Sequence, residues 1–193
     1  PELRRAKTKE QLELMRDFGF TAVPVGGPAV TAVDLNARTV SLRFDAMETM
    51  FELAREAGMG KTPEQKLMAV QLGMARSITR RLPGSPGPRV DQNPGIEFEQ
   101  PEFIDIYRDG LRQYRNFLQR MNMPVAVEIV DEPREVPNPW NRNLKHTCAY
   151  GDLMAEAEIT RFVTPMGDRQ SGLDYTVLVD LSLIHISEPT RPY

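Results

Sequence analysis

Apolar residues recur at intervals of three and four along several stretches of the chain, and short apolar runs lie between these stretches. This spacing is typical of helices that bury one face, and the short runs are typical of buried strands. Residues 30–44 alternate apolar and polar positions around 34–38 and predict a hairpin-like excursion, after which Asp45 is expected to cap a helix. The pattern predicts helices over 7–18, 46–57, 102–121 and 143–157, and strands over 20–25, 67–72, 125–130, 159–164 and 176–180.

Strands that alternate with helices indicate a parallel sheet with crossover connections, which is an α/β fold. Five candidate strands, with a helix before the first and a break within the last element, favour a partial (β/α)8 TIM barrel that is truncated at both ends. An open α/β sheet is the alternative architecture. The chain length does not separate the two, because barrels of 200 to 250 residues and ordinary single domains are both compatible with it.

The end of the chain differs in origin from the rest under our interpretation. Residues 181–191, Leu-Ser-Leu-Ile-His-Ile-Ser-Glu-Pro-Thr-Arg, resemble the translation of a transposase mosaic end followed by a library primer site. We therefore treat residues 181–193 as an adapter-derived tail and exclude its His185 and Glu188 from the chemistry. A genuine amphipathic tail is the alternative. Residues 1–180 are interpreted as one partial catalytic barrel domain, and because the chain starts at Pro1 without a methionine we expect both ends to be cut.

Composition and charge exclude several functions. A formal net charge of -3 and a pI near 5.5 argue against nucleic acid as a partner. The single cysteine, Cys148, allows no intrachain disulfide and no Cys/His cluster with zinc spacing, so we predict no metal site and expect a packed thiol. No apolar run reaches the length of about 18 residues that a membrane span needs. No cofactor is predicted, and the oligomeric state and cell compartment stay open.

Two neighbouring carboxylates, Asp131 and Glu132, follow the predicted strand 125–130 directly and precede Pro133. The carboxyl end of a barrel strand is where active sites are built. Pro133 disfavours the helical region for Glu132, so the two side chains are expected to diverge and to take separate roles. Burial and like charge would raise the pKa of one carboxyl, as a general acid requires. Alternatively, Asp131 caps a turn and Glu132 pairs with an arginine at the surface.

The only tryptophan of the chain, Trp140, lies in the loop after this strand between Asn138 and Asn141. An aromatic ring there can form a platform for the apolar face of a sugar, and the two asparagines can bind its hydroxyls. Alternatively, Trp140 packs under the loop. The proline- and glycine-rich stretch 81–101 predicts a long loop that could cover an active site. His146 falls in the next predicted helix and is interpreted as a surface or packed residue.

The order of these motifs, from Gly19-Phe20-Thr21-Ala22-Val23 to Asp131-Glu132-Pro133, resembles barrel glycoside hydrolases of family 123 and related bacterial proteins. The resemblance covers most of residues 1–180, but only the Asp-Glu-Pro motif is specific. It implies that Glu132 is the general acid and that Asp131 orients the 2-acetamido group of an N-acetylhexosaminide, which acts as the nucleophile. The broader retaining clan has Asn-Glu-Pro at this place, and Asp131 departs from that pattern. The alternative function is a non-catalytic carbohydrate-binding or structural domain.

Overall fold

The computed structural model describes residues 2–62, 66–70, 72–83, 98, 100–128, 144–167 and 176–180, which form a mixed α/β arrangement. The elements in chain order are α1 (Glu2–Asp17), β1 (Ala22–Val25), β2 (Ala29–Asp34), β3 (Thr39–Arg43), α2 (Asp45–Glu56), β4 (Lys66–Val70), α3 (Leu72–Thr79), α4 (Pro101–Met121), β5 (Val125–Glu128), α5 (Leu144–Glu156), β6 (Phe162–Gly167) and β7 (Thr176–Asp180).

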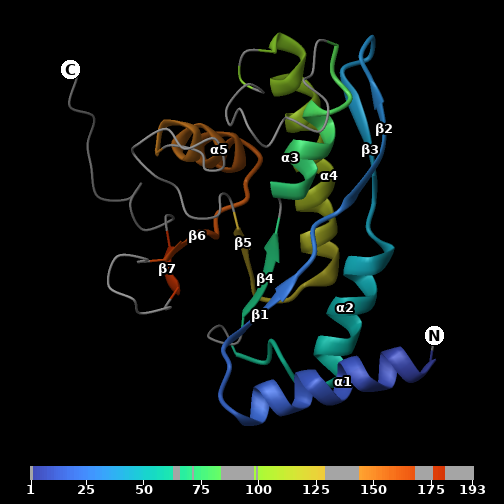
Figure 1. The fold of residues 1–193 in the computed structure, drawn as a ribbon, viewed down its shortest axis with the longest axis vertical. Coiled ribbons are helices and arrows are strands. Elements are labelled where there is room, and N and C mark those ends of the chain that lie inside the picture. The colour runs from blue at the N-terminus through green and yellow to red at the C-terminus, as the bar shows by residue number, and fades with distance from the viewer. Residues whose placement is uncertain are drawn as a thin grey trace.

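Five of the strands form one sheet in the order β1-β4-β5-β6-β7, and β2 and β3 form a separate hairpin (Figure 1). The first four strands of the sheet run parallel, and Val23, Leu67 and Val125 lie opposite one another in its register. The described strands form an open sheet and do not close into a barrel.

The last strand of the sheet runs against the predicted direction. β7 pairs antiparallel with β6, so the expectation of a wholly parallel sheet is wrong there. The physical reason lies in the connection. Only eight residues separate Gly167 from Thr176, whereas a crossover to a parallel neighbour needs about a dozen or more.

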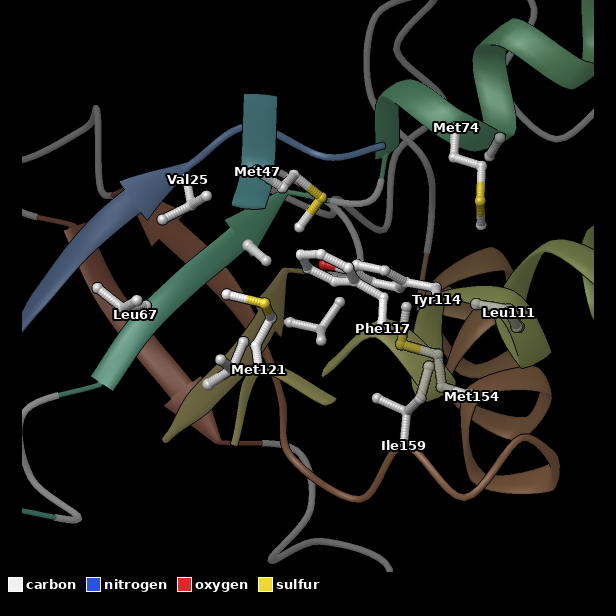
Figure 2. Packing of buried hydrophobic residues seen from close by; sticks show 14 of the residues in the cluster. Val25, Met47, Leu67, Met74, Leu111, Tyr114, Phe117, Met121, Met154 and Ile159 are labelled. Atoms are coloured by element: carbon white, nitrogen blue, oxygen red, sulfur yellow. The ribbon is translucent and has the colours of Figure 1, made fainter. Parts of the chain in front are cut away.

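Helices cover one face of the sheet. Successive parallel strands lie side by side, and right-handed crossovers between them place their helices on the same face. Val25 and Leu67 of the strands belong to one buried cluster with Met47 of α2 and Phe117 of α4, part of which Figure 2 shows. Side chains alternate along a strand, so Ala126, which lies outside this cluster, faces the opposite side.

With 21 residues, α4 is the longest helix that the structure describes, and it holds the hairpin in place. Pro101 stands in its first turn, where a missing N–H costs no helical hydrogen bond, and Asn122 ends it in the left-handed conformation. The side-chain amide of Gln113 donates to the carbonyl oxygen of Val40 at 2.7 Å. Gly110 allows Val40 of β3 to approach the helix closely. One face of α4 is therefore core for both the sheet and the hairpin.

Three helices end in the same hydrogen-bonded turn, in which one residue takes the left-handed conformation. In α1 this residue is Gly19, with φ 81°, and in α2 it is Gly58, with φ 82°. In α5 it is Glu158, with φ 60°, whose N–H donates to Ala155 while that of Ile159 donates to Met154. A residue with a side chain is strained by about 1–2 kcal/mol in this conformation relative to glycine.

Several local predictions are wrong, and packing explains why. Helix α3 was not predicted because it is short and contains Gly73, although its buried Met74 and Ile78 show helical spacing. Asp45 begins α2 and makes no side-chain capping hydrogen bond, since Phe44 occupies the cap. The predicted strand 159–164 begins late, at Phe162, because the end of α5 buries Ile159.

Cys148 is exposed, so the expectation of a packed thiol is wrong. The neighbouring positions Thr147 and Tyr150 of α5 are buried and face the rest of the protein. Position 148 lies about 100° around the helix from the first of these and falls outside the buried face.

Candidate functional site

The carboxyl ends of the parallel strands define the candidate site. β1 ends at Val25, β4 at Val70 and β5 at Glu128, and their parallel register brings these ends to one edge of the sheet. Ligands of α/β sheets and barrels bind at this edge, because the connecting loops there leave space between strand and helix. The predicted Asp-Glu-Pro motif begins three residues after Glu128.

Glu128 is the one buried acidic residue among those the structure describes, with 7% of its surface exposed. It pairs in register with Val70 and Val163, at the centre of the sheet. By alternation from Val127, which belongs to the helix-covered core, Glu128 projects toward the other face. A buried carboxylate is costly unless it has a polar partner, and Glu128 takes part in such an interaction. Buried ionisable groups are common at functional sites, so Glu128 is a candidate site residue.

Aromatic side chains pack beside this edge where α4 begins. The rings of Phe103 and Tyr107 stack with their centroids 5.2 Å apart, and Tyr107 meets Tyr150 of α5 edge-on at 5.4 Å. Phe98 contacts both α4 and α5, with its centroid 5.0 Å from that of Tyr150. These contacts tie the loop residue Phe98 to the two helices that flank β5, and they give the edge a rigid aromatic wall.

The predicted site residues lie outside the part of the chain that the structure describes. This holds for the carboxylate pair, Asp131 and Glu132, and for the proposed sugar-binding residues Asn138, Trp140 and Asn141. Of the other residues considered, His146 lies on α5. The roles assigned to all of them stay predictions.

Glu128 was not singled out from the sequence, although a signal was present. It is the only charged residue in the apolar run 125–130, which was predicted to be a buried strand. A charge inside such a run must be desolvated, and this alone marks the position.

Within the described ranges, no group of His, Cys, Asp and Glu side chains is placed to hold a metal ion. The helices of these ranges include none that is long and apolar enough to cross a membrane. Comparisons with protein-family models, with curated proteins and with solved structures gave no match to this chain.

Proposed function

We propose that this chain belongs to a carbohydrate-active hydrolase of the (β/α)8 type that acts on N-acetylhexosaminides or related glycans. The observation that carries the proposal is the position of β5, a buried strand paired on both sides, which ends three residues before Asp131 of the Asp-Glu-Pro motif. Three residues from Glu128 to Asp131 span at most about 11 Å, so the carboxylate pair is tethered to the carboxyl edge of the sheet.

The strand order supports the barrel part of the proposal. In a (β/α)8 barrel each strand lies parallel beside the next one along the chain, with every helix outside. β1, β4, β5 and β6 follow this order once the β2–β3 hairpin is treated as an insertion. The sheet face opposite the helices, which carries Glu128, would then line the barrel interior. The antiparallel β7 departs from the pattern at the edge of the sheet.

In the proposed reaction, Glu132 protonates the glycosidic oxygen as the bond from C1 breaks. The carbonyl oxygen of the substrate's own 2-acetamido group attacks C1, and Asp131 accepts a hydrogen bond from the amide N–H and stabilises the charge that develops there. Water then opens the cyclic intermediate, with Glu132 acting as the base. Glu128, a buried acidic residue, ends the strand that precedes the pair and lies at the same edge of the sheet.

The first test is Glu132→Gln in the full-length enzyme, with a p-nitrophenyl N-acetylhexosaminide as substrate. We expect kcat to fall by about 100-fold or more, because the amide cannot donate the proton. Asp131→Asn should lower turnover of the same substrate, while Glu10→Gln, at an exposed position of α1, should leave it unchanged. Unchanged activity of Glu132→Gln would show that Glu132 is not the general acid. Glycan binding without turnover, unaffected by Glu132→Gln, would instead favour a non-catalytic sugar-binding domain.

A further inference from the structure

A continuous groove runs between α4 and the end of α5, near the amino edge of the sheet and away from the carboxyl edge. It consists of three hollows with volumes of about 360, 400 and 100 Å³. Arg115 and Glu158 border the first two hollows, and Arg112 and Glu156 border the last two. The largest hollows have the size of a small-molecule site.

Four arginines line this groove. Arg108, Arg112 and Arg115 lie at i, i+4 and i+7 of α4 and therefore share one helical face. Arg108 donates from Nε to Glu156 at 2.8 Å, and this hydrogen bond lowers the pKa of Glu156. Within the described residues Arg112 meets no carboxylate of α5. Arg112 instead pairs with Asp109 of its own helix at 3.2 Å. The surplus of positive charge therefore lies in the hollow where Arg115 and Arg161 meet one described carboxylate, Glu158.

The hollow at the starts of β5 and β6 combines charge with neutral hydrogen-bonding groups. Arg115 and Arg161 border it, and Gln119, Asn122 and Thr160 add amide and hydroxyl groups. Arg161 forms no ion pair with any residue that the structure describes, and Nε of Arg115 is buried there without a hydrogen-bond partner. Apolar side chains of α4 and β5 complete its lining. Polar surface prevails over apolar surface in this hollow, which suits a charged ligand.

Glu158 is held in a strained conformation at the mouth of this hollow. It occupies the left-handed position that glycine fills in α1 and α2, as Gly19 and Gly58 show. Its carboxylate accepts a hydrogen bond from Arg115. The carboxylate of Glu158 neutralises Arg115 and thus occupies the position at which an external anion would bind.

We propose that this hollow binds a small phosphate monoester, with Arg115 and Arg161 contacting the phosphate group. A monocarboxylate would only replace Glu158 on Arg115, with no gain in charge. A phosphate monoester carries close to two negative charges at neutral pH and can engage both guanidinium groups, so it displaces Glu158 favourably. Gln119 and Asn122 are placed to bind the polar part of the molecule that carries the phosphate.

The test is calorimetric titration of the full chain with glucose 6-phosphate at low ionic strength, with glucose as the uncharged control. Glucose 6-phosphate should bind and glucose should not, and added NaCl should weaken binding. Arg115→Gln and Arg161→Gln should each weaken binding about tenfold or more. Arg120→Gln, on the same helix but outside the groove, should leave it unchanged. Absence of binding up to about 10 mM, or equal binding by Arg161→Gln, would overturn the proposal.

Glu158→Gly provides a variant that should fold at least as well as the parent. Glycine removes both the backbone strain and the carboxylate that occupies Arg115. We expect glucose 6-phosphate to bind several-fold more tightly to this variant. If the ion pair of Glu158 and Arg115 only joins α4 to the end of α5, affinity for the phosphate will not change, and the proposal is then wrong.

Discussion

Tyr114 lies fully buried in the core, and its hydroxyl has no hydrogen-bond partner among the described residues. Its ring packs beside Phe117, as Figure 2 shows, and stacks at 6.4 Å on Phe44. An unpartnered buried hydroxyl costs about 1–3 kcal/mol of desolvation. We therefore expect Tyr114→Phe to raise the free energy of unfolding by up to about 1 kcal/mol at neutral pH, as measured by urea denaturation. A loss of stability would show that the hydroxyl has a partner.

Burial also raises the pKa of Tyr114 above its ordinary value of 10.0. Below pH 10 the phenol is neutral in both the folded and the unfolded chain and adds no pH dependence. Above pH 10 the unfolded chain releases this proton and the folded chain keeps it, so stability falls as the pH rises. The advantage of Tyr114→Phe should accordingly grow by up to about 1.4 kcal/mol per pH unit above 10. An advantage independent of pH in that window would contradict the burial of the phenol.

At the scale of elements, the contact between α4 and the hairpin depends on Gly110. A Cβ atom there would lie 3.1 Å from Sδ of Met74 and 3.1 Å from Cγ1 of Val40. Gly110→Val should therefore lower the free energy of unfolding by about 2 kcal/mol through overpacking. Replacing glycine with alanine at an exposed helix position raises the free energy of unfolding by about 1 kcal/mol. Gly110→Ala should raise it by less, because the added Cβ atom contacts Met74 and Val40.

Gly73, near the start of α3, is the matched control, because a Cβ atom there meets nothing within 4 Å. Gly73→Ala should raise the stability by a part of that gain, about 0.5 kcal/mol. Urea denaturation of the variants side by side gives the comparison. Full stability of Gly110→Val would show that the hairpin can move away from α4 without cost.

Elements could be predicted where one pattern was long enough to dominate. The eight buried positions of α4 recur over five turns, so its helix followed from spacing alone. α3 has only eight residues, too few for the pattern to stand out. β6 begins at Phe162 and not at residue 159, because the turn at Glu158 buries Ile159. Glycine usually marks such a turn in a sequence, and here it is absent. Spacing predicts a helix or strand, whereas its ends depend on tertiary contacts.

At the scale of the whole molecule, the alternation of strands and helices predicted an α/β fold, and the structure confirms this coarser prediction. The direction of β7 depends on the short connection from β6, and the pattern of apolar residues does not predict strand direction. For the site, the sequence predicted that chemistry lies after β5. Glu128 was missed although it is the only charged residue of the apolar run 125–130, and its pairing with Val70 and Val163 explains why it is buried.

The solvent exposure of the two faces of the sheet distinguishes an open sheet from a closed barrel. Val25 belongs to the helix-covered core with 1% exposure, whereas Pro24 is exposed on the other face of β1. Proline suits β1 because this strand is at the edge of the sheet, where its missing N–H leaves no hydrogen bond unmade. Single cysteines at these two positions, in a Cys148→Ser background, can report the exposure of each face to a thiol reagent.

We expect Pro24→Cys to react at the rate of an exposed thiol and Val25→Cys to react at least about 100-fold more slowly, since labelling the latter requires local opening of the core. The measurement is the labelling rate under native conditions, with the same rates in urea as the reference for intrinsic reactivity. Protection at both positions would mean that other segments cover the second face, as closure into a barrel requires. For a form of the protein that closes into the proposed barrel, we expect this second outcome, because Pro24 would then lie on the inner wall.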